Sequence, residues 1–265
     1  MKIALMDSGI GLLPAAAATR RLRPDADLLI SNDPDGMPWG PRTPEDLTAR
    51  ALAVALAAAE HRPDALVVAC NTASVHALPA LRAALEPEIP VIGTVPAVKP
   101  AAAGGGKIAI WATPATTGSA YQRGLIRDFA DGAEVTEVPC PGLADAVEHA
   151  DPEAVDRAVA AAAALTPSDV RAVVLGCTHY ELVEDRILAA LEARGRAAGL
   201  PKLVFHGSAE AVAAQALRRI GAEPAPDAEP TGRLSVLLSG RPGTLPAAAL
   251  TYAEARLLGA TATAH

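Results

Sequence analysis

The sequence predicts an α/β protein made of two similar three-layer domains, each with a parallel sheet, that face each other across a cleft. Short apolar runs alternate with longer alanine-rich amphipathic stretches, as strands joined by crossover helices do. The runs are apolar throughout, which is typical of parallel strands buried on both faces. In chain order, the strand candidates are KIALMD, ALVVAC, PVIGT, KIAIWAT, AVVLGC, KLVFH and RLSVLLS.

One helix in the first half has clear start and stop signals. Thr43 is a predicted N-cap, Pro44 suits the first turn, and apolar residues follow on one face as far as Ala58. The next strand, residues 65–69, leads directly to Cys70. Because ligands bind beyond the carboxyl ends of strands in open α/β sheets, Cys70 is a candidate site residue.

A linker is predicted at residues 99–106, KPAAAGGG, because three consecutive glycines have high backbone entropy and no side chain to pack. We therefore expect a domain boundary near residue 97. A second series of strands begins at Lys107.

Two strand ends in the two halves match each other. Aligned on the cysteine, VVACNTA (residues 67–73) and VVLGCTH (residues 173–179) share the pattern V-[VL]-[AG]-C, with a threonine one or two residues after the cysteine. The match predicts two similar half-molecules, each providing one cysteine and one threonine. A chance match between two short apolar strands is the alternative.

Two thiols on opposite sides of one carbon atom suit racemisation, in which one thiolate removes a proton and the other thiol delivers one. Cys70 and Cys177 are the candidates, and each needs a neighbour that adjusts its protonation. Asp7 ends the first strand and could assist Cys70, while His179 lies two residues after Cys177. Glu148 is a third polar group that could reach either centre.

The carbanion formed in such a reaction requires hydrogen bonds to a developing enediolate. Backbone N–H groups at the turns after Asp7, Cys70 and Cys177 can donate them. The side chains that can also do so are Ser8, Asn71, Thr72 and Thr178. Pyridoxal phosphate is not expected, because none of the chain's four lysines lies in a convincing site for a Schiff base.

Composition excludes several other classes of function. The formal net charge of -7 and the absence of basic runs disfavour nucleic acid as a ligand. No apolar stretch is long enough to span a membrane, and the first residues do not form a secretory signal, so we expect a cytoplasmic protein.

The three cysteines are widely spaced, which predicts reduced thiols rather than disulfides or a metal site, and Cys140 is interpreted as a packing residue. Ser8-Gly9-Ile10-Gly11 lacks the third glycine of a dinucleotide loop, so NAD is not expected.

The motifs together resemble the glutamate racemases of the aspartate/glutamate racemase family. In the family's order they are DSGIG (7–11), PWG (38–40), ACNTA (69–73), ATPAT (112–116), LGCTHY (175–180) and HGSAEAVA (206–213). The resemblance implies that Cys70 acts on D-glutamate and Cys177 on L-glutamate, assisted by Asp7, Glu148 and His179. The substrate contacts it implies are Asp7, Ser8, Trp39, Gly40, Asn71, Thr72, Thr113, Thr116, Thr178 and His179.

The resemblance also implies the domain organisation and the biological role. One domain would comprise residues 1–96 with 209–265, the other residues 97–208. The enzyme would need no cofactor or metal and would supply D-glutamate for peptidoglycan. A homodimer is its candidate assembly.

Four positions depart from the family pattern. Trp39 replaces tyrosine, Leu12 replaces a second glycine, Glu181 replaces proline and Gly207 replaces aspartate. Two alternatives therefore stay open. One is a racemase of the same family that acts on aspartate, a hydantoin or another carboxylate, and the other is a binding or regulatory relative in which Trp39 blocks the substrate.

Overall fold

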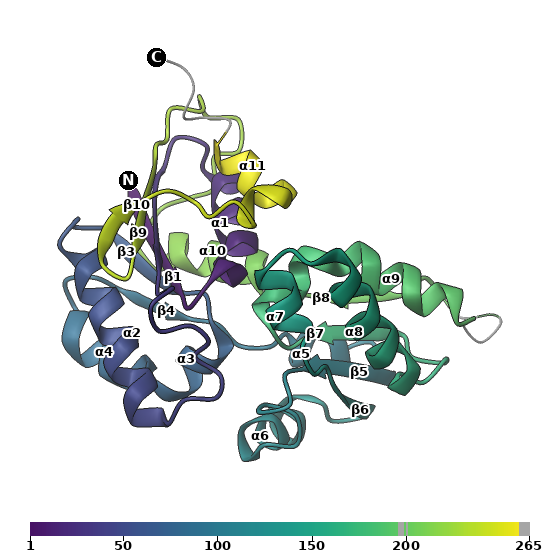
Figure 1. Cartoon of the computed structure of the whole chain (residues 1–265). Coiled ribbons are helices and arrows are strands. Elements are labelled where there is room, and N and C mark those ends of the chain that lie inside the picture. Colours follow the sequence, from purple (N-terminus) through teal and green to yellow (C-terminus); the bar gives the residue numbers. More distant parts are fainter. Residues whose placement is uncertain (196–198, 200, 260–265) are drawn as a thin grey trace. The chain divides into compact units, whose positions relative to one another are not determined.

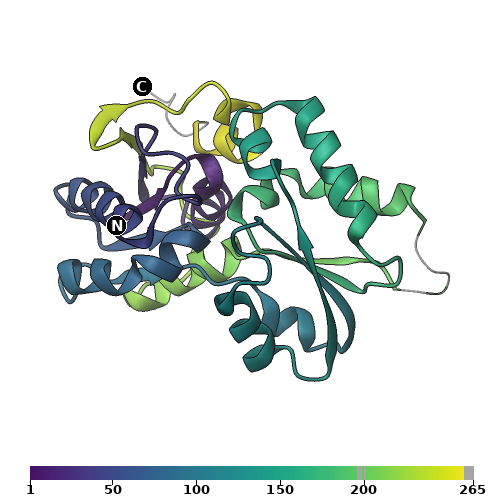
Figure 2. The same ribbon diagram turned by 60° about the horizontal axis from the view of Figure 1, so that its bottom comes forward.

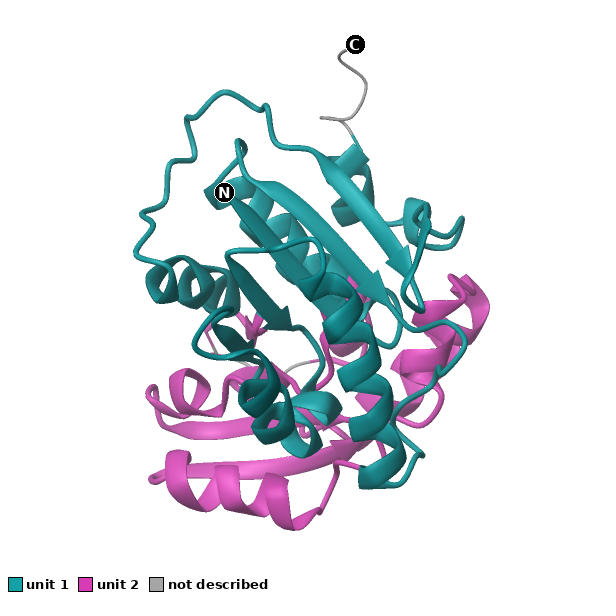
Figure 3. Ribbon diagram, turned by 90° about the vertical axis from the view of Figure 1, so that its left-hand side faces the viewer, with its two compact units in different colours: residues 1–95, 209–265 teal, residues 96–208 magenta. Residues whose placement is uncertain are grey.

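The computed structural model describes residues 1–195, 199 and 201–259. By its internal contacts the chain divides into two compact units, residues 1–95 with 209–265 (unit 1) and residues 96–208 (unit 2), coloured separately in Figure 3. The last six residues of the predicted first domain, 260–265, lie outside the described residues. No helix in the described ranges is both long and apolar enough to cross a membrane.

Unit 1 is built around a six-stranded sheet in the described part of the chain, with strand order β10-β9-β2-β1-β3-β4. Its neighbouring strands are parallel, apart from the antiparallel pair β9–β10. The bounds are β1 (Lys2–Asp7), β2 (Asp27–Asn32), β3 (Ala65–Val68), β4 (Val91–Gly93), β9 (Leu234–Leu238) and β10 (Arg241–Gly243).

Helices cover both faces of this sheet, as Figure 1 shows. Alternate strand residues such as Ala4, Met6 and Val68 share a core cluster with the buried faces of α2 and α4, while α1 and α10 lie on the other side. The helical segments are η1 (Ile10–Leu12), α1 (Leu13–Leu22), α2 (Pro44–Ala59), α3 (Asn71–His76), α4 (Leu78–Leu85), α10 (Ala209–Arg219), η3 (Ala249–Thr251) and α11 (Ala253–Gly259).

Unit 2 repeats the three-layer plan around a four-stranded parallel sheet of order β6-β5-β7-β8 (Figure 2). Ile108, Ile110 and Val174 form a core cluster with α5 and α6, and α8 packs against α7 and α9. The strands are β5 (Gly106–Ala112), β6 (Ala133–Pro139), β7 (Ala172–Leu175) and β8 (Val204–His206). The helical segments are α5 (Val98–Ala102), α6 (Ala120–Phe129), α7 (Leu143–Glu148), α8 (Pro152–Leu165), η2 (Thr178–Val183) and α9 (Glu184–Ala193).

The seven predicted strands are all present, and the α/β class with two largely parallel sheets is confirmed. Within the described ranges, three strands were missed. β2 has only three consecutive large apolar residues, and β6 alternates polar and apolar side chains because it lies at the edge of its sheet. β10 is a short, exposed edge strand that contains Pro242, and it makes the antiparallel pair that was not predicted.

The predicted linker over residues 99–106 is wrong for most of its length. Helix α5 extends to Ala102 and strand β5 begins at Gly106, which leaves residues 103–105 between them. Alanine favours the helix, and Pro100 is tolerated because it lies in the first turn. Gly105 and Gly106 have positive φ angles of 61° and 77°, so these glycines form a tight turn into β5 rather than a free linker.

The predicted helix is confirmed as α2. The Thr43 hydroxyl accepts a hydrogen bond from the N–H of Asp46 at 3.3 Å, and Pro44 is the first helical residue. Its buried residues are those of the predicted apolar face, Leu47, Ala51, Val54, Ala55 and Ala58. This face packs over β1 and β2 and shares a core cluster with Val68 and Cys70.

Candidate active site

The two motif cysteines occupy equivalent positions in the two units. Cys70 follows β3 and is the N-cap residue of α3, while Cys177 follows β7 and is the N-cap residue of η2. Their backbone angles nearly coincide, at φ −143°, ψ 119° for Cys70 and φ −135°, ψ 134° for Cys177. The repeated sequence V-[VL]-[AG]-C thus corresponds to a repeated strand-to-helix turn.

In unit 1 the predicted acid lies at the strand end next to Cys70. Strands β1 and β3 are parallel neighbours with Met6 opposite Val68, and the N–H of Ala69 donates to the carbonyl of Met6 at 2.9 Å. Asp7 ends β1, so its carboxylate and Cys70 belong to adjacent strand ends. The exposed fractions are 1% for Asp7 and 8% for Cys70.

Asp7 also orients its neighbour. Its Oδ1 accepts hydrogen bonds from the N–H of Ser8 at 2.7 Å and from the Ser8 hydroxyl at 3.5 Å. Ser8 and Asn71 are buried, and Thr72 is half-buried in the first turn of α3. Unit 1 therefore brings together the site residues predicted from DSGIG and ACNTA.

The indole of Trp39 lies in the core of unit 1. It is 1% exposed, shares a core cluster with Leu47 and Cys70, and donates from Nε1 to Oδ2 of Asp33 at 3.0 Å. The indole is thus enclosed within unit 1, and the predicted substrate contact of Trp39 would have to use its backbone. Gly40 is exposed, with open space where a side chain would be.

In unit 2 a thiol, an imidazole and a carboxylate form a line of successive contacts. Nδ1 of His179 is 3.8 Å from Sγ of Cys177, and Nε2 is 2.8 Å from Oε2 of Glu148. The side chains of His179 and Glu148 are only 11% and 12% exposed. Glu148 is the last residue of α7, a position that spacing in the sequence did not reveal.

This geometry assigns the roles of the two ring nitrogens. An ionised carboxylate only accepts hydrogen bonds, so Nε2 of His179 carries the proton and donates to Glu148. In the neutral ring Nδ1 is then an acceptor that faces the thiol of Cys177. The arrangement can take a proton from Cys177 and return it, while Glu148 stabilises the imidazolium.

The remaining predicted threonines of unit 2 follow the neighbouring strands β5 and β7. Thr113 and Thr116 follow β5, with their hydroxyl oxygens 3.2 Å apart, and β5 is the parallel neighbour of β7. The N–H of Gly176 donates to the carbonyl of Trp111 at 2.8 Å, which joins the ends of these two strands. Thr178 is buried at the start of η2.

Cys140 serves packing. It is 1% exposed, and burial together with the nearby charge of Cys177 raises the pKa of its thiol to about 12. Its carbonyl accepts a hydrogen bond from the Tyr180 hydroxyl at 3.4 Å, which helps to hold η2. This burial agrees with the interpretation from the sequence.

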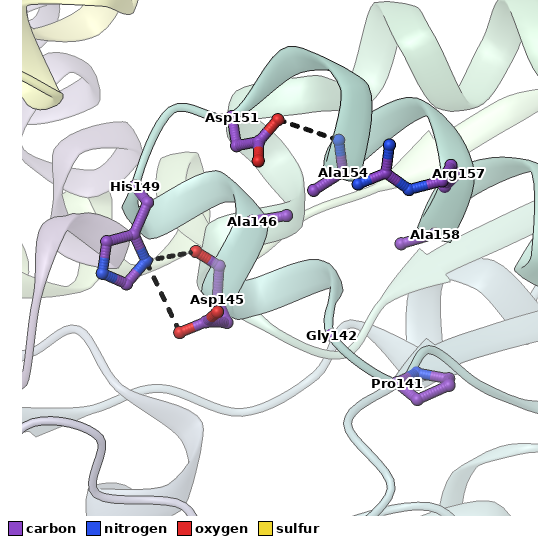
Figure 4. Close-up of a pocket in the computed structure, with 9 residues that line it drawn as sticks. All are labelled: Pro141, Gly142, Asp145, Ala146, His149, Asp151, Ala154, Arg157 and Ala158. Carbon is purple, nitrogen blue, oxygen red and sulfur yellow. Dashed lines mark hydrogen bonds and ion pairs between the residues drawn. The ribbon is translucent and has the colours of Figure 1, made fainter.

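A surface hollow of about 610 Å³ lies along α7 and α8 (Figure 4). Its lining includes Asp145, His149, Asp151 and Arg157, and Nδ1 of His149 contacts both the backbone and the carboxylate of Asp145. No predicted site residue lines it. Among the described residues, no group of three or more histidine, cysteine or acidic side chains is arranged to bind a metal ion.

The burial of Cys140 predicts its behaviour toward alkylating reagents. Since the pKa is about 12, roughly one thiol in 10⁴ is ionised at pH 8, and the sulfur is enclosed. We expect iodoacetamide to leave Cys140 unmodified in the folded protein and to modify it after denaturation, as read by peptide mass mapping. Rapid modification in the native state would show that this site is open.

The position of Trp39 predicts a loss of stability on substitution. Trp39→Phe removes the donor to the buried Asp33 and leaves a small cavity, which should lower the free energy of unfolding by about 2 kcal/mol in urea titrations. A ring that faced solvent would change it by less than about 0.5 kcal/mol. The second result would contradict the buried indole.

The comparisons with known proteins agree on one family. The model of the Asp/Glu/hydantoin racemase family matches residues 12–215. Glutamate racemase of Roseiflexus sp. (strain RS-1) is 38% identical over 192 residues, covering 71% of this chain and 70% of the relative. That of Sphingopyxis alaskensis is 39% identical over 197 residues, covering 71% and 73%.

Two solved structures are similar over nearly the whole length. Glutamate racemase of Escherichia coli, in complex with L-glutamate and the activator UDP-MurNAc-Ala, has a TM-score of 0.74 at 28% identity and covers 89% of this chain and 88% of its own. The Thermus thermophilus enzyme in complex with β-chloro-D-alanine has a TM-score of 0.67 at 31% identity, covering 98% and 93%.

Proposed function

The chain belongs to the Asp/Glu/hydantoin racemase family, and we propose that it is a glutamate racemase that uses Cys70 and Cys177 to move the α-proton. The observation that carries this proposal is the equivalent position of the two thiols. Each follows a parallel strand, occupies the N-cap position of the next helical turn and has an acid or base close by: Asp7 for Cys70, His179 for Cys177. A racemase that uses two bases needs such a matched pair, with one acid–base group for each face of the carbon.

In the L-to-D direction the Cys177 thiolate removes the α-proton of L-glutamate. The Cys70 thiol then delivers its own proton to the opposite face of the same carbon. One turnover leaves Cys177 as a thiol and Cys70 as a thiolate, and the D-to-L direction restores the first state. His179 can accept the proton from Cys177, and Asp7 in its protonated form can supply one to the Cys70 thiolate; exchange of both groups with solvent protons then completes the reset between turnovers.

Most of the barrier lies in forming the carbanion. A turnover of about 10 per second corresponds to a barrier of roughly 16 kcal/mol, so the enediolate must be stabilised strongly. The donors we assign to the substrate carboxylates are Ser8, Asn71, Thr72, Thr113, Thr116 and Thr178, with the backbone N–H groups of Trp39 and Gly40. No step requires a cofactor, because the thiols and these donors account for each proton and each developing charge.

The cellular role follows from the reaction. D-Glutamate made by this enzyme would be used for peptidoglycan, whose precursors are assembled in the cytoplasm.

A homodimer stays a prediction, which light scattering of the purified protein would test.

Removal of either proton carrier should abolish racemisation. Cys70→Ala and Cys177→Ala should each lower kcat/KM by at least about 10³-fold, since one face of the carbon then has no acid or base. Circular dichroism of L- and D-glutamate solutions gives the rate. Cys140→Ala is the matched control and should retain activity, because that thiol is buried and takes no part.

The same assay separates the alternatives. If the protein racemises aspartate or another amino acid faster than glutamate, the substrate assignment is wrong although the thiol mechanism stands. If no amino acid in a panel of both enantiomers is racemised, and none exchanges its α-hydrogen with deuterated solvent, the binding or regulatory alternative is favoured.

Glu148→Gln should weaken the acid–base function on the Cys177 side alone. The equilibrium constant of a racemase is 1, so kcat/KM must fall equally in both directions, and isotope effects are needed to locate the defect. The primary effect with α-deuterated L-glutamate should rise, and that with α-deuterated D-glutamate should fall, because the barrier next to Cys177 becomes more limiting. Asp145→Asn on the exposed side of α7 is the control. Equal changes for both enantiomers would contradict the assignment.

A further inference from the structure

Two of the departures from the family pattern lie against each other in unit 2. Glu181 replaces proline in η2, and Gly207 replaces aspartate after β8. Oε1 of Glu181 accepts hydrogen bonds from the N–H of Ser208 at 2.7 Å and from its hydroxyl at 2.9 Å. A Cβ atom placed on Gly207 would collide with Oε2 of the same carboxylate. The Glu181 carboxylate thus occupies the space that a side chain at position 207 would need.

The same pair of bonds occurs in unit 1 within an Asp-Ser sequence. Oδ1 of Asp7 accepts from the N–H of Ser8 at 2.7 Å and from its hydroxyl at 3.5 Å. Ser8 directly follows β1, and Ser208 follows β8 after one glycine. An aspartate at position 207, the residue that the family resemblance implies there, could therefore bind Ser208 as Asp7 binds Ser8.

From this geometry we propose that Glu181 is a positioning residue, whose carboxylate replaces the one missing at position 207 and orients Thr178 and His179 for the reaction. The inference rests on the proposed function, because Thr178 and His179 are the groups it would serve. This role explains both departures together, because Glu181 in η2 provides the carboxylate that the family pattern would have after β8.

The location of Glu181 in η2 is what connects it to the site. A 3-10 helix has three residues per turn, so Glu181 lies one turn after Thr178 on the same side. Its two bonds attach η2 to the segment that follows β8, the parallel neighbour of β7. Ser208 is only 3% exposed, so its two donors would have little access to water if the carboxylate were removed.

Gly207 fits the same explanation. Its φ angle is not in the positive range, so the backbone does not demand glycine there. The nearest atoms to the added Cβ are the three at the end of the Glu181 side chain. The carboxylate, rather than the backbone conformation, therefore accounts for the missing side chain.

The test is a cycle of variants of the full chain, with kinetics on glutamate as one measurement. Glu181→Ala should lower kcat about tenfold and change KM less than about threefold, since it disturbs orientation rather than a substrate contact. Glu181→Gln should stay close to wild type, because the amide oxygen still accepts from Ser208. Asp185→Asn, an exposed carboxylate nearby with no bond to Ser208, is the matched control.

The decisive variants involve Gly207. Gly207→Asp alone should lower kcat, because two carboxylates then compete for one space. Glu181→Ala/Gly207→Asp should recover activity above either single variant, since the carboxylate introduced at position 207 can take over the bonds to Ser208. If the double variant shows only the product of the two single effects, or if Glu181→Ala matches wild type, the proposal is overturned.

A second measurement does not depend on turnover. The NMR signals of the His179 ring should shift in Glu181→Ala and return in the double variant, whereas Glu181→Gln should leave them in place. If the wild type fails to racemise glutamate, the proposed function is wrong, and these signals still decide whether Glu181 positions His179. Unchanged His179 signals in every variant would overturn the positioning role.

Discussion

The burial of parallel strands on both faces is the constraint on which the rest of the structure depends. Strands β1, β3 and β7 are covered by helices on each side, so nearly every side chain within them is apolar. Polar and reactive side chains can then occur only where a strand ends and the loop begins. Asp7, Cys70 and Cys177 all lie at such ends, which is why each unit has its candidate thiol at the carboxyl edge of its sheet.

In unit 2 that edge is held by three consecutive side chains of η2. His179 bonds to Glu148 at the end of α7, Tyr180 to the carbonyl of Cys140 after β6, and Glu181 to Ser208 after β8. A 3-10 helix has poor internal hydrogen-bond geometry, so these outward bonds define its orientation. Proton transfer tolerates little misplacement of the donor and acceptor groups. These three hydrogen bonds hold the side chains of η2 in place, although the backbone hydrogen bonds of a 3-10 helix are themselves weak.

The departures from the family pattern are accommodated within single units. Leu12 is completely buried in η1, and the indole of Trp39 is enclosed in the core and bonded to Asp33. Glu181 and Gly207 occupy one shared space. None of these changes removes a thiol, the imidazole or the carboxylate that we assign to proton transfer, so the departures alter packing and support rather than the chemistry.

Much of this protein could be predicted from its sequence because the signals are local. The period of apolar residues predicted the strands and α2, and the order of the short motifs predicted the family. Two of the strands that escaped prediction, β6 and β10, lie at sheet edges, where the apolar run is interrupted, and the third, β2, is an interior strand whose apolar run is short. The glycines near residue 105 suggested a linker because composition does not distinguish a flexible segment from a tight turn.

The sequence by itself predicted the residues that we assign to the chemistry, because Cys70 and Cys177 recur in similar motifs at the ends of apolar strands. Only the tertiary structure decided which groups adjust them. Glu148 reaches His179 because α7 ends beside η2, and Glu181 reaches Ser208 because β8 runs parallel to β7. Those pairings join residues about thirty positions apart, and no local pattern encodes the packing that brings them within hydrogen-bonding distance.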